Sequence, residues 1–237
     1  MGDITSWLFK TVKTISLLLV LGGSVSACAA TSWKEEVLLH DGSKIIVMRT
    51  AERGGRQEIG QRPPIKNQTL IFTMPETGKS IKWEDRYSED IGSASFLPML
   101  LDILNGKAYL VASPMGCLSY NKWGRPNPPY VIFQYENDQW ERIALQELPA
   151  EFKLPNLIIS SPDDRAKKEE VNGIVSAEKI TEMNAGFKQP EYHTILREAL
   201  PDKRIKEMCE ERVLYKGNWI LPNDPIARQF IDRQQSK

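Results

Sequence analysis

The sequence predicts a mainly β fold, an antiparallel sandwich or open barrel built from hairpins and followed by short C-terminal helices. Apolar, β-prone runs alternate with turn signals from Trp33 to about Leu148, and helix-start signals appear only after Pro155. Turn centres near positions 42, 78, 106 and 138 recur about every 30 residues, so a propeller-like arrangement is the alternative. The side chains around these turns do not repeat, which favours the sandwich or barrel.

The first two hairpins carry the strongest local signals. Asp41-Gly42 separates the runs 36–40 and 44–48, and this dipeptide suits a type I′ turn because both of its central residues need positive φ. Pro75 to Gly78 forms the turn between the runs 69–73 and 80–84. The returning run 80–84 alternates apolar and polar residues, as a half-buried strand does.

Three further hairpins follow the same logic. Asn105-Gly106 turns the run 100–104 into 108–111, and Asn137-Asp138 turns 131–135 into 140–145. A fifth, shorter hairpin spans 213–221 around Lys216 to Asn218.

Helices are expected in the last third of the chain. Ser161-Pro162 and Ser176 are typical helix starts, and Pro190 is expected to open a third helix. Asp224-Pro225 starts a last helix, whose inner face is expected to hold the apolar residues Ile226, Phe230 and Ile231. Because the fifth hairpin lies between helices, we predict a single domain over 28–237, with hairpins in 28–150 and a mixed α/β extension, 151–237, packed on them.

The first 27 residues are predicted to be a signal peptide. Lys10 and Lys13 form a basic region, an apolar run follows over 15–21, and small residues fill 22–27. This run is shorter than the roughly 20 residues that a spanning helix needs, which disfavours an uncleaved membrane anchor.

Val25-Ser26-Ala27-Cys28 resembles the lipobox of bacterial lipoprotein precursors, with Val25 where leucine is commoner. The resemblance implies cleavage before Cys28 and lipidation of its thiol. In Gram-negative lipoproteins, Ala29 after the cysteine favours the outer membrane, so the expected location is the outer membrane facing the periplasm. The alternative is a soluble periplasmic protein, because Ala27-Cys28-Ala29 also fits ordinary signal peptidase. The mature body resembles uncharacterised β-rich proteobacterial lipoproteins, from which no functional residue carries over.

Cysteine usage adds a second expectation. With Cys28 lipidated, Cys117 and Cys209 remain as a pair, and an oxidising compartment favours a disulfide between them. Two separately buried thiols are the alternative.

Composition and motifs exclude several kinds of function. The segment before Cys28 contains Lys10, Lys13 and Asp3, which leaves 29 basic and 30 acidic residues from Cys28 onward. A nucleic-acid-binding protein usually has a basic surplus, so we predict no nucleic-acid partner. The two histidines, His40 and His193, lie far apart with no zinc spacing, and no nucleotide-binding or serine-hydrolase motif occurs. The sequence therefore predicts no catalytic residue, metal or cofactor.

The segment 113–130 is the candidate binding region, because it is long for a connection between two hairpins and is shaped by glycine and proline. It is rich in residue types that are enriched at binding hot spots. The predicted binding residues are Tyr120, Asn121, Lys122, Trp123, Arg125 and Tyr130. The alternative is a structural loop whose aromatic side chains plug the open end of the sandwich.

Two classes of function remain. The first is a lipid-anchored binding module of the cell envelope, with the membrane and an envelope protein as partners; one version is an inhibitor or immunity-type lipoprotein. The second is an envelope hydrolase whose site the sequence does not reveal. The lack of catalytic motifs favours the binding module.

Replacement of Cys28 tests the predicted anchor. Cys28→Ser is expected to abolish palmitate incorporation and membrane retention, because the thiol that carries the lipid is removed. Metabolic palmitate labelling followed by membrane fractionation measures both. Labelling that persists in the variant would contradict lipidation at this residue.

Overall fold

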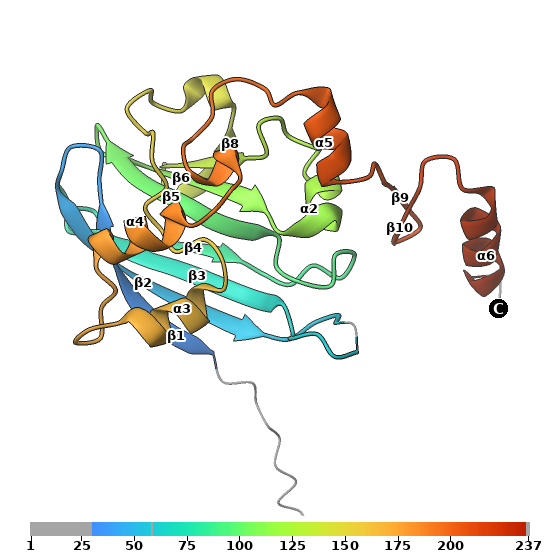
Figure 1. Cartoon of the computed structure of the whole chain (residues 1–237), viewed down its shortest axis with the longest axis horizontal. Coiled ribbons are helices and arrows are strands. Elements are labelled where there is room, and N and C mark those ends of the chain that lie inside the picture. Colours follow the sequence, from blue (N-terminus) through green and yellow to red (C-terminus); the bar gives the residue numbers. More distant parts are fainter. Residues whose placement is uncertain (1–29, 58, 236–237) are drawn as a thin grey trace, which may run out of the picture.

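Two four-stranded antiparallel sheets packed face to face form the body of the protein (Figure 1). The computed structural model describes residues 30–57 and 59–235, so the predicted signal peptide and Cys28 lie outside the described residues. The strand orders are β1-β2-β3-β4 and β5-β6-β7-β8, so within each sheet every strand pairs with the one that follows it in the chain. The hairpin-built sandwich predicted from the sequence is therefore confirmed.

Along most of the first sheet, buried positions alternate with exposed or partly exposed ones. Inward residues of this sheet meet inward residues of the second sheet in one apolar layer, which includes Val47, Phe72 and Leu110. The first sheet consists of β1 (Thr31–Leu38), β2 (Lys44–Arg53), β3 (Ile65–Thr73) and β4 (Ser80–Asp85).

The second sheet is apolar on both faces, because the chain after β8 folds back over its outer side. There Val111 and Ile132 pack against Phe152, Ile159 and neighbouring side chains. A bulge between Pro98 and Leu100 lets β5 change register against β6. The second sheet consists of β5 (Phe96–Leu104), β6 (Lys107–Pro114), β7 (Val131–Glu136) and β8 (Gln139–Ile143).

A buried ion pair closes the side of the sandwich where β1 and β5 lie. The side chains of Glu35 and Arg49 are fully buried, and Arg49 Nη1 lies 2.9 Å from Glu35 Oε1. The same Nη1 donates to the carbonyl of Ile158, and the backbone N–H of Ile158 donates to Glu35 Oε2. The pair therefore holds the segment around Ile158 between the two sheets.

Asn156, two residues before Ile158, fixes the same segment. Its side-chain amide donates to the carbonyls of Leu38 and Leu101, and its side-chain oxygen accepts from the N–H of Leu101. One side chain thus joins β1 to β5. Polar side chains thus close this side of the sandwich by pairing with backbone groups. Buried backbone N–H and C=O groups are costly to leave unpaired, so these contacts stabilise the fold.

The helices after Pro155 follow the sequence only in part. α3 (Pro162–Glu169) and α4 (Ala177–Ala185) pack on β1, and Ser176 caps α4 by accepting from Lys179 N. The helix expected from Pro190 is a single 3-10 turn, η2 (Pro190–Tyr192), and a second such turn is η1 (Leu145–Glu147). Two helices were not predicted: α2 (Gly116–Lys122) within the candidate binding segment, and α5 (Asp202–Met208).

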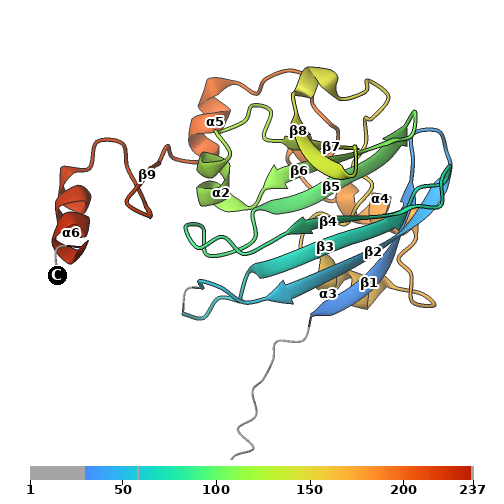
Figure 2. The same ribbon diagram turned by 180° about the vertical axis from the view of Figure 1, so that it is seen from behind.

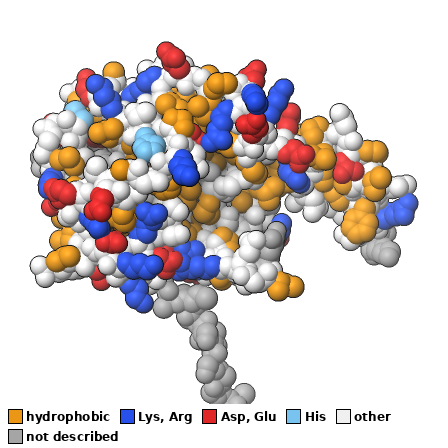
Figure 3. Space-filling model, in the orientation of Figure 1, with side chains coloured by type: hydrophobic (Ala, Val, Ile, Leu, Met, Phe, Trp, Pro, Cys, Tyr) orange, Lys and Arg blue, Asp and Glu red, His pale blue; other side chains and the backbone are white. Residues whose placement is uncertain are grey.

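The C-terminal segment projects from the body (Figures 1 and 2). It contains β9 (Val213–Tyr215), β10 (Asn218–Ile220) and α6 (Pro225–Gln235). Ile231 is buried, but Ile226 is 79% and Phe230 61% exposed, so the predicted inner face is wrong for these two residues. Hydrophobic side chains are correspondingly visible on this segment in Figure 3. The reason is that the helix covers only its own small hairpin.

Glu35→Gln tests the importance of the buried pair. The variant is expected to lose about 3–5 kcal/mol of unfolding free energy, because the Arg49 guanidinium stays buried without a counter-charge. The matched control is Glu36→Gln on the opposite face of β1, which removes a partly exposed pair with Lys44 and is expected to cost about 0–1 kcal/mol. Urea unfolding of both variants measures the difference. Equal losses would contradict the assigned role of Glu35.

The attachment of α3 is expected to depend on pH. Burial works to raise the pKa of Asp163, but the hydrogen bonds and charge of Arg53, with the charge of Arg62, outweigh it, so this pKa is lowered. A lowered folded-state pKa stabilises the fold above the unfolded pKa of about 3.9 and stops doing so as pH falls through the folded value.

Asp163→Asn is therefore expected to lose about 2 kcal/mol at neutral pH, a loss that shrinks as the pH is lowered below about 4. Urea unfolding from neutral to acidic pH compares the variant with the parent protein. A stability difference that stays constant with pH would show that Asp163 contributes through packing alone.

Candidate functional site

A groove lined by aromatic rings runs along the open side of the sandwich, between the edge strands β4 and β8. Its volume is about 410 Å³, within the range of ligand sites in proteins. Among the described residues, no segment comparable to the one around Ile158 runs between the sheets here; residues of β4, β8, the end of α2 and the connection from β4 to β5 line this edge. The aromatic residues that line the groove are Trp83, Phe96, Trp123, Phe133 and Trp140, with Tyr87 at the rim.

The rings pack edge to face and tilted rather than stacked. The ring centroids of Phe96 and Trp123 lie 4.7 Å apart, and Phe133 lies 5.3 Å from Phe96 and 6.1 Å from Trp83. These separations are typical of favourable aromatic pairs. The floor of the groove is thus rigid, since each ring is held by at least one other from a different strand or helix.

Trp140 crosses the groove and joins the two edge strands. Its indole Nε1 donates to the backbone carbonyl of Lys82 at 2.9 Å, and its ring packs 5.3 Å from Tyr135. The contact satisfies one carbonyl on the free edge of β4. Side chains that occupy an exposed edge in this way protect it against unspecific strand pairing.

The rim of the groove carries charges of both signs. Lys122 Nζ lies 2.8 Å from Asp90, and the guanidinium of Arg142 lies over the ring of Trp123 at 5.7 Å from its centroid. The indole Nε1 of Trp123 is buried and has no hydrogen-bond partner among the described residues. The unpaired donor of Trp123 thus lies inside the groove wall, and the exposed part of this residue is its ring.

Asp85 forms the inner wall. Its carboxylate accepts the backbone N–H groups of Ser95 and Phe96 and the side-chain amide of Gln68. Burial raises the pKa of Asp85, although these hydrogen bonds oppose the rise. Because its oxygens are occupied, Asp85 shapes the connection from β4 to β5 and anchors Phe96 in the groove.

Two of the predicted binding residues line this groove, Lys122 and Trp123. Lys122 is the last residue of α2 and Trp123 is its C-cap, so both lie where the end of this helix faces the open edge. The other four predicted residues turn inward and hold the structure together.

Tyr120 is buried beneath the guanidinium of Arg125, whose carbon lies 5.1 Å from the ring centroid. Arg125 also donates to the carbonyls of Cys209 and Glu210. Asn121 donates to the carbonyl of Glu210 and accepts from Arg212 N. These three residues tie α2 to the chain after α5.

Tyr130 has a comparable structural role below the second sheet. Its hydroxyl donates to the carbonyls of Glu191 and Thr194 and lies 3.3 Å from the N–H of Leu196. Burial raises the pKa of Tyr130 well above its ordinary value. Tyr130 therefore fixes the segment around η2 rather than a ligand.

A disulfide joins Cys117 on α2 to Cys209 at the end of α5, with the Cα atoms 5.3 Å apart. Figures 1 and 2 both show α2 and α5 side by side. The bridge and the contacts of Asn121 and Arg125 thus hold the root of the C-terminal segment at one place on the body. Cys28, the third cysteine, lies outside the described residues.

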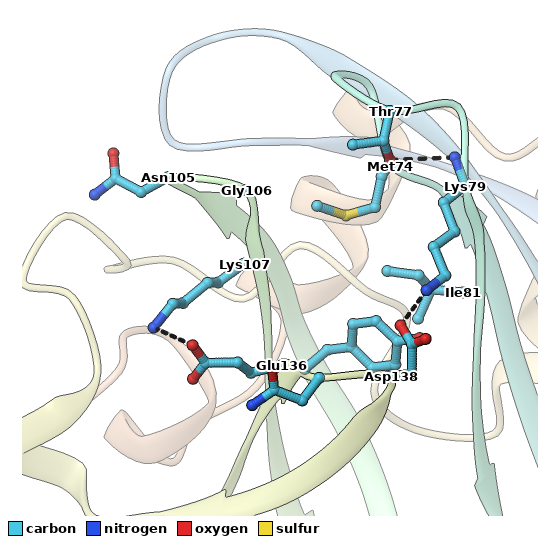
Figure 4. Close-up of a pocket in the computed structure, with 11 residues that line it drawn as sticks. Met74, Thr77, Lys79, Ile81, Asn105, Gly106, Lys107, Glu136 and Asp138 are labelled. Carbon is cyan, nitrogen blue, oxygen red and sulfur yellow. Dashed lines mark hydrogen bonds and ion pairs between the residues drawn. The ribbon is translucent and has the colours of Figure 1, made fainter.

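A second hollow lies at the hairpin end of the open side (Figure 4). It measures about 340 Å³ and is crossed by ion pairs between Lys107 and Glu136 and between Lys79 and Asp138. Both pairs are exposed, and exposed pairs contribute little energy. This hollow shares no lining residue with the groove, and turn residues and paired charges make up most of its lining.

A third cavity, of about 410 Å³, surrounds His40 at the closed side. His40 Nδ1 lies 2.8 Å from Asp102 Oδ1, and the backbone N–H of His40 donates to Asp102 Oδ2. Burial raises the pKa of Asp102, although the hydrogen bond with His40 opposes the rise. Such a pair orients an imidazole as in many acid–base sites.

The surroundings of His40 do not complete a nucleophilic site. Among the described residues that line this cavity, only Thr181 carries a side-chain hydroxyl, and it donates to the carbonyl of Ala177. Cys117 belongs to the disulfide and lines a different cavity. His193 is exposed.

Within the described residues, no group of three or more His, Cys, Asp or Glu side chains is arranged to hold a metal ion. In the same part of the chain, no helix combines the length and the apolar character needed to span a bilayer. No protein-family model matches the chain, and comparisons with curated proteins and with solved structures give no significant match.

Proposed function

We propose that this chain is a lipid-anchored protein of the cell envelope that binds an envelope protein through the aromatic groove between β4 and β8. The anchor rests on the lipobox-like sequence that ends at Cys28. The binding role rests on the groove, in which several tryptophan and phenylalanine rings converge from separate elements at an open edge.

The single observation that carries the binding role is the partial exposure of Trp123 and Trp140, which lie over the buried rings of Trp83, Phe96 and Phe133 beside a charged rim. Buried aromatic anchors with a polar surround are typical of binding hot spots. Trp123 combines a large ring, partial exposure and an unpaired indole N–H. A partner that packs an apolar side chain on the exposed part of this ring would complete its burial.

Further features agree with an envelope location. A disulfide between Cys117 and Cys209 is suited to an oxidising compartment. The near-neutral charge of the mature chain gives no reason to expect nucleic acid as a ligand. An inhibitor or immunity-type lipoprotein is one version of this proposal, in which the bound protein is an enzyme.

An envelope hydrolase is the second candidate, and the His40–Asp102 pair is the observation that favours it. In this proposal His40 acts as a general base on water in the adjoining cavity. We rank it second because Asp102 also accepts the backbone N–H groups of His40 and Ile103, so the pair already has a structural role where β1 ends.

Site-specific photocrosslinking in living cells separates the two candidates. A photoreactive phenylalanine at Lys122, on the rim of the groove, is expected to form one discrete adduct. The same probe at Lys168, exposed on α3, is the control and is expected to form none. Trp123→Ala is expected to remove the adduct, since loss of such an anchor weakens binding by roughly 30-fold or more.

His40→Ala completes the design. It is expected to leave the adduct at Lys122 unchanged, because the groove and the His40 cavity lie on different sides of the sandwich. Thermal unfolding of each variant checks that the fold is intact. An adduct that survives Trp123→Ala but disappears with His40→Ala would reject the groove as the binding site.

A further inference from the structure

The proposed anchor lies very close to the folded body. Only Ala29 and Ala30 separate Cys28 from Thr31, the first residue of β1. An extended chain advances at most about 3.6 Å per residue, so these steps span roughly 11 Å at most. With Cys28 held in a bilayer, as the proposed function requires, the start of β1 stands next to the lipid headgroups.

The strand register places a loop at this same end. Thr31 pairs with Ala51, and β2 ends two residues later at Arg53, opposite Ile65 at the start of β3. The loop 54–64, of which residue 58 is not described, therefore leaves the first sheet beside the start of β1. Figures 1 and 2 show β1's first residues and this loop on the same lower side of the body.

The base of the loop is fixed. The N–H of Arg56 donates to the carbonyl of Gly92 at 2.8 Å, and Gly54 N donates to Pro64 O at 3.0 Å. Gly55 has φ +91°, and a Cβ on it would lie 2.3 Å from Gly92 O. Only glycine fits this close approach, which pins the loop to the connection between β4 and β5 and leaves its tip pointing away.

The tip carries the most exposed apolar side chain of the described residues, Ile59, which is fully exposed. Arg56 and Arg62 flank it, and both are exposed. Arg62 is paired with Asp163 and Asp164, and Arg56 donates to the carbonyl of Glu89. The cations are thus held beside the tip without a large net charge.

An aromatic residue stands beside the loop. Tyr87, on the connection from β4 to β5, is 39% exposed, and Lys66 Nζ lies 6.0 Å from its ring centroid. Ile59 is the one large apolar residue between Arg56 and Arg62, and the residues beside it are Gln57, Glu58, Gly60 and Gln61. A fully exposed isoleucine between two arginines, with a tyrosine beside the loop, combines residue types that occur where proteins meet a membrane interface. Lys and Arg side chains are also visible along the lower edge of the body in Figure 3.

We infer that this end of the sandwich rests on the phospholipid surface, with Ile59 inserted at the boundary between headgroups and acyl chains. The inference rests on the proposed lipid anchor and adds a second contact to it. One lipidated residue followed by two alanines leaves the body free to rotate about the tether, whereas two contacts fix which face meets the bilayer.

Depth-sensitive fluorescence on the lipidated full-length protein tests the inference. Ile59→Cys and Ile226→Cys each add one thiol that reacts with a fluorescent label, since Cys117 and Cys209 are bridged and Cys28 carries the lipid. Ile226 is the matched control because it is 79% exposed on α6, away from β1. The probe surface is a vesicle of phosphatidylethanolamine and phosphatidylglycerol.

The label at position 59 is expected to shift to shorter emission wavelength and to be quenched several-fold more strongly by spin-labelled lipid than the label at 226. Equal quenching at both positions would overturn the inference. Palmitate incorporation and flotation with vesicles are measured on the same samples. Protein that incorporates palmitate and floats without quenching at 59 refutes the loop contact alone, whereas protein that does neither refutes the anchor as well.

Discussion

The buried pair of Glu35 and Arg49 is the interaction on which the rest of the architecture depends. Both side chains are excluded from water, so neither can be left unpaired without a large penalty. The carboxylate also accepts from the indole of Trp33 and from the N–H of Ile158. By holding Ile158 in place, the pair brings the chain after the last long strand back between the two sheets, where Leu157 and Ile159 complete separate apolar layers.

Two other buried carboxylates repeat this arrangement elsewhere in the fold. Asp85 accepts the N–H groups of Ser95 and Phe96 where the chain crosses from the first sheet to the second. Asp102 accepts the N–H and the imidazole of His40 where β1 turns. Each acid satisfies backbone or ring donors that the sheet ladders do not reach. Glu35 and Asp102 lie at the closed side of the sandwich, whereas Asp85 lies at the opposite side, where aromatic side chains fill the rest of the edge and form the groove.

The sequence was sufficient for the hairpins because their signals are local. Asp41-Gly42 and Asn105-Gly106 set the turns, and alternation over 80–84 sets which side chains point inward. The binding segment could not be read in the same way. Tyr120 and Tyr130 have the composition of a binding loop, but contacts with chain more than 60 residues away turn Tyr130 inward.

The groove itself was out of reach for the same reason. Trp83 and Trp140 each belong to a different hairpin, and only the packing of β4 over β8 places them on one surface. The aromatic residues are visible in the sequence, but their mutual contacts are not, because the two edge strands belong to different sheets and are not paired by backbone hydrogen bonds. Of the predicted residues, Lys122 and Trp123 reach the groove because they end a short helix that no sequence signal had marked.

The position of the groove bears on how a partner would reach it. Arg86 and Tyr87 line its rim, and they belong to the connection from β4 to β5 that also supports the loop 54–64 through Gly92. If this end of the body rests on the bilayer, as proposed, the mouth of the groove lies near the membrane surface. A partner confined to the same membrane needs to search only in two dimensions, so an anchor of so few residues favours partners that are themselves held at the membrane. In the proposed arrangement the short tether and the loop contact would together set the orientation in which the aromatic groove meets a partner.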